Sequence, residues 1–160
     1  MKSSRERVVL FVCVENRFRS QIAEAYFNAN PPSGWRAISA GSEPAEEVHP
    51  NAVKLMQEEG LDISRKKPKP LTRELERIAD VGVIVCGESG SKKCPVLFTR
   101  YVEQWSIPDP AGMSIEEARR IRDEIKRRVM DLVERIARGD IPPKGKLGGI
   151  KLTLNQLRQP

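Results

Sequence analysis

Short runs of hydrophobic residues alternate along the chain with segments in which hydrophobic residues recur at helical spacing. The run from Val8 to Val12 is continuous, which is typical of a strand buried on both faces of a parallel sheet. In the next segment, Ser20 to Asn30, the hydrophobic residues lie three or four positions apart, as on one face of a helix. The opening pattern therefore predicts a strand, a loop and a helix.

The same alternation continues to the end of the domain. We expect further strands at residues 35–39, 81–86 and 101–107, and a helix at residues 51–59 that ends at Gly60. A long helix is expected from a cap at Ser114, with Glu117 three residues later, to Gly139. The pattern predicts one α/β domain over residues 1–139. A basic tail containing Pro and Gly follows at residues 140–160, of which residues 150–157 alternate enough to form a strand.

Composition and charge limit the possible classes of protein. With 28 basic and 22 acidic residues, the formal net charge is +6, which favours anionic partners without separating small oxyanions from nucleic acid. The 39% of hydrophobic residues form no apolar stretch of about 18 residues, and the basic N-terminus runs into a strand pattern rather than a secretion signal. We expect a cytoplasmic protein that is a monomer or weak dimer and has no membrane partner.

The loop between the first strand and the first helix carries the clearest chemical signal. It reads Cys13-Val14-Glu15-Asn16-Arg17-Phe18-Arg19-Ser20, a cysteine and an arginine separated by five residues and followed by serine. A chain that turns from strand into helix can point successive backbone N–H groups inward, and the helix N-terminus adds partial positive charge. We expect residues 14–19 to hold a tetrahedral oxyanion, with the planar guanidinium of Arg19 binding two of its oxygens.

Cys13 is the candidate nucleophile, because nearby cations and a helix N-terminus favour ionisation of a thiol. Ser20 can donate a hydrogen bond to the sulfur, and Asn16 can brace the loop through its amide. In the alternative interpretation, Cys13 only packs at a strand end and Arg19 is a solvated helix residue.

At these residues the sequence resembles the low-molecular-weight tyrosine phosphatase superfamily and, within it, the thioredoxin-coupled arsenate reductases. The resemblance covers residues 7 to about 138 and rests on the segments FVCVENRFRSQIAEAYF, ISAGS, HPNAVKLMQEEGLDIS, VCGESGSKKCP and PDPAG. It implies a phosphatase-like three-layer sandwich with a central four-stranded parallel sheet flanked by helices. It also implies that Cys13 attacks the oxyanion and that Asp109, between two prolines, protonates the leaving oxygen; otherwise Asp109 is a plain turn residue.

The resemblance gives the other two cysteines a role. In a reductase, Cys86 attacks Cys13 to release arsenite, Cys94 attacks Cys86, and a thioredoxin-like protein reduces the resulting Cys86–Cys94 disulfide. In the alternative interpretation, Cys86 is a buried strand residue and Cys94 an incidental thiol. A zinc site is not expected, because no cysteine pair has metal-binding spacing and the one histidine, His49, is interpreted as a helix-start residue. No cofactor or metal is expected.

Two enzymatic functions remain open. The first is arsenate reduction; the second is hydrolysis of phosphotyrosine or another phosphomonoester through a phosphorylated Cys13. Ala111 and Gly112 follow the Asp-Pro pair where related phosphatases have tyrosines, which favours a small inorganic anion such as arsenate or phosphate, although Phe18 could supply an aromatic wall. Nucleic-acid binding is not favoured, because the basic residues lack interleaved aromatic residues.

A last hypothesis concerns a cation. Asn16, Glu24 and Ser39 match residues that help bind potassium in some related reductases, but the acidic residue expected just after Ser64 is missing. Lys69 lies near its place. We therefore expect the ammonium of Lys69 to replace the metal cation.

Overall fold

The protein, in a computed structural model that describes residues 6–86 and 95–141, is built on a four-stranded sheet. All strand pairs are parallel and the strand order is β2-β1-β3-β4. The strands are β1 (Arg7–Cys13), β2 (Trp35–Gly41), β3 (Val81–Ile84) and β4 (Tyr101–Gln104). The predicted α/β fold with a central parallel sheet is confirmed.

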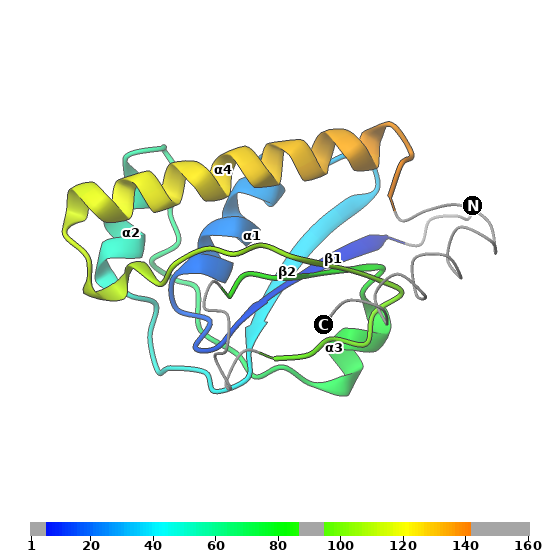
Figure 1. The fold of residues 1–160 in the computed structure, drawn as a ribbon, viewed down its shortest axis with the longest axis horizontal. Coiled ribbons are helices and arrows are strands. Elements are labelled where there is room, and N and C mark those ends of the chain that lie inside the picture. The colour runs from blue at the N-terminus through cyan, green and yellow to red at the C-terminus, as the bar shows by residue number, and fades with distance from the viewer. Residues whose placement is uncertain (1–5, 87–94, 142–160) are drawn as a thin grey trace.

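Helices cover both faces of this sheet (Figure 1). Helices α1 (Arg19–Ala29), α2 (Pro50–Gln57) and α4 (Ile115–Ala137) lie on one face, and α3 (Arg73–Ile78) lies on the other. A short 3₁₀ helix, η1 (Pro110–Gly112), precedes α4. The arrangement is the three-layer sandwich that the family resemblance implies.

The central strand β1 is buried on both of its faces, as its continuous hydrophobic run predicts. Val9 and Phe11 join the larger core cluster beneath α1, α2 and α4. Val8, Leu10 and Val12 point the other way, into a second cluster that contains Cys13 and Cys86. This alternation follows from the two-residue period of a strand.

The carboxyl ends of three strands meet at one edge of the sheet. Cys13, at the end of β1, is in register with Gly41 at the end of β2. On the other side Val12 is in register with Ile84, and the N–H of Val85 donates to the carbonyl of Val12 at 2.8 Å. In a parallel sheet this edge is where ligands bind, and the next residues of each strand converge there.

Element boundaries agree with the sequence at the N-terminal caps of α2 and α4 and differ at several element ends. Ser114 and Glu117 form the predicted capping box of α4, and His49 caps α2, accepting the N–H of Asn51. The strand expected at residues 35–39 continues to Gly41, and the helix expected at residues 51–59 ends at Gln57. The strands expected to reach residues 86 and 107 end at Ile84 and Gln104. Helix α3 is an element that the pattern does not predict.

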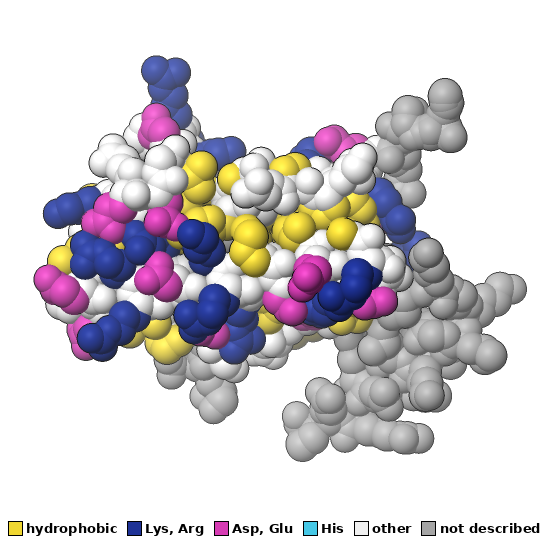
Figure 2. Space-filling model, turned by 90° about the horizontal axis from the view of Figure 1, so that it is seen from above, with side chains coloured by type: hydrophobic (Ala, Val, Ile, Leu, Met, Phe, Trp, Pro, Cys, Tyr) yellow, Lys and Arg dark blue, Asp and Glu magenta, His cyan; other side chains and the backbone are white. Residues whose placement is uncertain are grey.

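The outer surface of α4 is charged and carries both basic and acidic side chains. Figure 2 shows Lys and Arg side chains interspersed with Asp and Glu over this helix. Several are paired along the helix, including Arg128 with Glu124 at 2.9 Å and Arg135 with Asp131 at 2.8 Å. Within residues 6–86 and 95–141, no helix has the length and hydrophobicity needed to cross a membrane.

Candidate active site

The loop from Cys13 to Ser20 places two hydrogen-bonding groups on the Cys13 sulfur. The Oγ of Ser20 lies 2.9 Å from the Sγ, and the backbone N–H of Asn16 donates to the Sγ at 3.3 Å. Cys13 and Ser20 are both buried. The expected contact between serine and sulfur is therefore present.

The direction of the Ser20 bond follows from its other partner. The side-chain amide of Asn16 donates to the Oγ of Ser20 at 2.7 Å. Because the hydroxyl accepts that bond, its single hydrogen is available to point at Cys13. The sulfur then accepts two hydrogen bonds, one from the Ser20 hydroxyl and one from the N–H of Asn16.

The segment after β2 orients the backbone of the loop. Backbone N–H groups of this segment donate to loop carbonyls in four places: Ser42 to Cys13 at 3.3 Å, Glu43 to Val14 at 2.8 Å, Ala45 to Glu15 at 3.0 Å and His49 to Arg17 at 2.9 Å. These four hydrogen bonds fix the orientation of the peptide groups in the loop. Residues 42–49 contain no chemical motif, so this role could not be predicted from the sequence.

Asn16 stabilises the loop through its backbone conformation and its side-chain hydrogen bonds. Its φ of 53° lies in the left-handed region, which asparagine tolerates better than most residues. Its Oδ1 accepts the backbone N–H of Lys69 at 2.9 Å and the amide of Gln21 at 3.2 Å. Gln21, almost fully buried on α1, is a further support that the sequence analysis missed.

Gly41 leaves the space through which this loop passes. A Cβ on Gly41 would lie 2.5 Å from the carbonyl oxygen of Val14 and 2.9 Å from the nitrogen of Asn16. Both are backbone atoms that cannot rotate away, so glycine is required here by close approach rather than by its own dihedral angles. A glycine that ends a strand beside a candidate loop is the signal that could have identified it.

Arg19 links the loop to the segment that carries Asp109. Its side chain is buried, and the Nη1 donates to the carbonyl of Ile107 at 2.7 Å. Asp109 follows two residues later, is exposed, and accepts the N–H of Ala111 through its Oδ1 at 3.0 Å. Asp109 therefore makes the contact expected of a plain turn residue. It also lies two residues after Ile107, whose carbonyl binds Arg19.

The suggestion that Phe18 supplies an aromatic wall for a substrate is wrong. It is buried in the larger core cluster, and its ring packs on that of His49 at a centroid distance of 5.0 Å. Burial and the nearby positive charge of Arg17 lower the pKa of His49 below its usual value, and its Nδ1 accepts a hydrogen bond from Asn51. Arg17 is paired with Glu15 at 2.6 Å.

Cys86 lies close to the loop in the fold although it is far along the chain. It comes two residues after β3, the strand beside β1, and it shares the smaller core cluster with Cys13. Both cysteines are buried thiols. Neighbouring strands lie about 4.8 Å apart, so the topology brings Cys86 to the same edge of the sheet as Cys13. Cys94 lies outside the described residues.

The buried carboxylate of Glu24, on α1, forms an ion pair with Lys66 rather than with the expected Lys69. Glu24, 4% exposed, accepts the hydroxyl of Ser39 at 2.5 Å and binds the ammonium of Lys66 at 2.9 Å. The assignment to Lys69 was wrong: Lys69 contributes its backbone N–H to Asn16 instead. The ammonium of Lys66 thus places a positive charge beside the buried carboxylate of Glu24.

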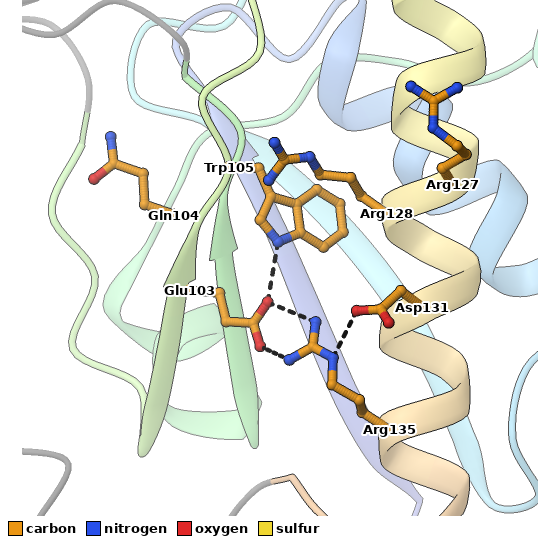
Figure 3. Close-up of a pocket in the computed structure, with 7 residues that line it drawn as sticks. All are labelled: Glu103, Gln104, Trp105, Arg127, Arg128, Asp131 and Arg135. Carbon is orange, nitrogen blue, oxygen red and sulfur yellow. Dashed lines mark hydrogen bonds and ion pairs between the residues drawn. The ribbon is translucent and has the colours of Figure 1, made fainter.

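A separate pocket of about 480 Å³ lies between β4 and α4 (Figure 3). Arg135 reaches from α4 and binds Glu103 through both of its Nη atoms, while the indole of Trp105 donates to Glu103 at 3.0 Å. Burial of Glu103 favours its neutral form, but these hydrogen bonds outweigh burial and lower its pKa. Arg135 is thus paired with both Glu103 and Asp131, and these ion pairs link α4 to the edge strand β4.

The geometry defines a class of protein: an α/β domain in which a cysteine at the end of the first strand begins a loop that leads directly into the first helix. The family described as low molecular weight phosphotyrosine protein phosphatase matches residues 8–140. The chain belongs to this family.

Comparison with individual proteins narrows the position within the family. An arsenate reductase of Brevibacillus brevis is 36% identical over 130 residues, which cover 81% of this chain and 96% of that protein. The crystal structure of an arsenate reductase from Archaeoglobus fulgidus is 40% identical with a TM-score of 0.67, covering 79% of this chain and 98% of that one. A thioredoxin-dependent arsenate reductase of Corynebacterium glutamicum is 33% identical with a TM-score of 0.70, covering 86% of this chain and 65% of that one.

Proposed function

We propose that this protein is an arsenate reductase that uses a relay of three cysteines. The observation that carries the proposal is the second buried thiol, Cys86, which lies two residues beyond β3 and shares a core cluster with Cys13. Strand β3 pairs with β1, which ends at Cys13. Hydrolysis of a phosphorylated cysteine needs only water, whereas reduction of arsenate must take two electrons from sulfur. The relatives named arsenate reductase support the same choice.

The first step forms an adduct at Cys13. Arsenate lies in the loop, where backbone N–H groups of residues 14–19 and the guanidinium of Arg19 bind its oxygens. The Cys13 sulfur, stabilised as thiolate by Ser20 and the N–H of Asn16, attacks arsenic. Asp109 protonates the oxygen that leaves as water. One donor of Arg19 is bound to Ile107, which holds the guanidinium while its other donors bind the oxyanion.

The second step reduces arsenic. The Cys86 thiolate attacks the Cys13 sulfur, the sulfur–arsenic bond breaks, and its electron pair leaves with arsenic as arsenite. A Cys13–Cys86 disulfide results. Cys94 then attacks Cys86, frees Cys13 as a thiolate, and leaves a Cys86–Cys94 disulfide for a thioredoxin-like dithiol to reduce.

The test is a coupled assay of arsenite formation with thioredoxin, thioredoxin reductase and NADPH. We expect Cys86→Ser and Cys94→Ser to lose turnover, because each removes one step of the relay. Hydrolysis of p-nitrophenyl phosphate in the same variants is the matched control for folding and for the Cys13 loop. If arsenite formation persists in both variants, the relay is wrong.

Hydrolysis of phosphomonoesters is the second candidate function, and the family match favours it as an alternative. It would use the same Cys13, Arg19 and Asp109, with Cys86 and Cys94 as bystanders. Substantial p-nitrophenyl phosphate hydrolysis by the wild-type protein, without any arsenite formed from arsenate, would support the phosphatase instead.

A further inference from the structure

The residue before helix α2 connects that helix to the loop of residues 13–20, the oxyanion loop. His49 lies against two consecutive residues of the loop, Arg17 and Phe18, and Arg19 is the next residue. The backbone N–H of His49 donates to the carbonyl of Arg17 at 2.9 Å. The imidazole packs on the ring of Phe18 at a centroid distance of 5.0 Å, and Phe18 is buried at the start of α1. A movement of His49 would therefore disturb the part of the loop that leads into Arg19.

The imidazole is held by a hydrogen bond that only its neutral form can make. Its Nδ1 accepts the backbone N–H of Asn51 at 3.0 Å. Pro50, the first residue of α2, has no N–H to offer. The N–H groups of Ala52 and Val53 donate to the carbonyl of His49. The N–H of Asn51 is therefore the donor in this first turn that depends on a side chain.

Protonation of His49 removes this acceptor. A neutral imidazole that accepts at Nδ1 carries its proton on Nε2, whereas both ring nitrogens of an imidazolium are donors. A proton on the Nδ1 would face the N–H of Asn51 across 3.0 Å, so the ring must turn away. Turning the ring breaks the cap of α2 and separates the ring from Phe18. Titration of His49 thus becomes a movement beside the oxyanion loop.

Charged groups on two neighbouring segments act on His49. Arg17 and Glu15 belong to the oxyanion loop, and Asp109 belongs to the segment before η1. Burial and the positive charge of Arg17 lower the pKa of His49 below its usual value of 6.5, although Asp109 and Glu15 act in the opposite direction. Below pH 6.5 the unfolded chain therefore binds more protons at this residue than the folded chain does. The stabilising contribution of the neutral cap is present above pH 6.5 and is lost as the pH falls through the lowered pKa.

We propose that neutral His49 is a positioning residue for the oxyanion loop: it holds Arg17 and Phe18 in place ahead of Arg19, and its protonation weakens oxyanion binding. This inference rests on the oxyanion site of the proposed function. Both candidate functions use that site, so the inference applies equally to arsenate reduction and to hydrolysis of phosphomonoesters. His49 acts through the loop and not on the reacting atoms.

The test measures the affinity for inorganic phosphate by isothermal titration calorimetry in wild type, His49→Asn and His49→Ala. Asparagine caps a helix well and does not titrate, whereas alanine provides no cap. At about pH 8 the affinity should fall in the order wild type, His49→Asn, His49→Ala, with about three- to fivefold between the first and the last. At about one pH unit below the midpoint of the His49 titration, wild type should lose about three- to fivefold relative to His49→Asn, because only wild type gives up its cap. Phosphate changes its own charge over this range, but it does so equally for every variant.

A second measurement gives the midpoint itself. His49 is the only histidine in the sequence, so proton NMR of the imidazole reports on this residue alone when the protein carries no histidine tag. We expect the midpoint in wild type to lie below 6.5. Arg17→Gln should raise it, because the variant removes a positive charge that opposes protonation.

The outcomes separate this proposal from the function on which it rests. An equal loss of phosphate affinity on acidification in wild type and His49→Asn, or a midpoint at or above 6.5, would overturn the role of His49. Tighter binding by wild type than by His49→Asn at the acidic pH would also overturn it, since that result is expected if the imidazolium only attracts the anion through space. Wild-type protein that binds no phosphate at about pH 8 would instead overturn the oxyanion site itself, and with it both proposals.

Discussion

At the residue scale, the proposed reaction depends on a few side chains whose hydrogen bonds a chemically similar residue could not make. Arg19 is buried and carries a charge, two features that are compatible only when the group is well hydrogen-bonded. Its bond to the carbonyl of Ile107 fixes one side of the guanidinium, and in the proposed mechanism the other donors bind the oxyanion. This residue and its neighbour Arg17 differ in burial and in partner, which makes the pair a controlled comparison.

We predict that Arg19→Lys lowers kcat for arsenate about a hundredfold, because the ammonium keeps the charge but loses the planar fork. Arg17→Lys is the matched control: Arg17 is paired at the surface with Glu15, and its replacement should change kcat by less than about twofold. The measurement is steady-state arsenite formation by both variants. Equal effects of the two changes would remove Arg19 from the oxyanion site.

The ion pair between Glu24 and Lys66 makes a second prediction. Because the ammonium already compensates the buried carboxylate, replacing sodium by potassium at constant ionic strength should leave wild-type activity unchanged. Lys66→Gln should lower activity and make it respond to potassium, whereas Lys67→Gln, at the next exposed lysine, should do neither. Several-fold activation of the wild type by potassium would show that a metal cation is still needed.

At the element scale, the loop is shaped by its contact with the end of β2. We predict that Gly41→Ala destabilises the protein by about 1–3 kcal/mol, because the new methyl group meets backbone atoms of Val14 and Asn16. Gly41→Ala should also lower activity by more than the loss of stability explains, because the Cys13–Ser20 loop must shift to make room for the methyl group. Gly112→Ala, with nothing within 4 Å of the added Cβ, is the control. Urea unfolding and arsenite formation together check both parts; normal activity in Gly41→Ala would argue against a preformed loop.

The elements also show what sequence patterns can predict. Strand β1 and helix α4 were predictable because burial on both faces and a capping box leave clear marks in the sequence. Helix α3 was not, because its six residues bury no side chain and so show no hydrophobic periodicity. Its cap could have been read from Thr72, which accepts the N–H of Leu75, with acidic residues in the first turn.

The candidate site likewise contains residues that the sequence predicts and residues that only the structure reveals. The cysteine, serine and arginine of the loop are local in sequence, so their spacing and position were enough to bring them together. Gly41 and the bonds from residues 42–49 are contacts between elements distant in the chain, and only the fold shows them. The wrong choice of Lys69 over Lys66 has the same origin: a turn decides which lysine points its side chain at Glu24.

At the scale of the whole molecule, ion pairs between helices add a dependence of stability on pH. Glu58, at the end of α2, binds Arg119 and Arg122 of α4 at 2.7 Å each. Hydrogen bonds from these arginines lower the pKa of Glu58 from 4.5 to about 2. Between these values the unfolded chain binds more protons than the folded one, so this contribution is present above pH 4.5 and is lost as the pH falls toward 2.

We therefore predict that Glu58→Gln is less stable than wild type at neutral pH and that the difference narrows as the pH falls from about 4.5 to about 2. Urea unfolding followed by tryptophan fluorescence at several pH values gives both curves. Glu46→Gln, at an exposed loop position, is the control. A difference that stays constant with pH would mean that the ion pairs of Glu58 do not link the two helices energetically.

The central claim is that reduction of arsenate passes through Cys13, Cys86 and Cys94 in turn, and a single turnover without reductant tests it most directly. Wild type should release one arsenite per chain and end with a Cys86–Cys94 disulfide. Cys94→Ser should also release one arsenite, but end with a Cys13–Cys86 disulfide, and Cys86→Ser should release none. Peptide mapping of the disulfides identifies each state. Arsenite released by Cys86→Ser, or no disulfide in Cys94→Ser after turnover, would contradict the relay.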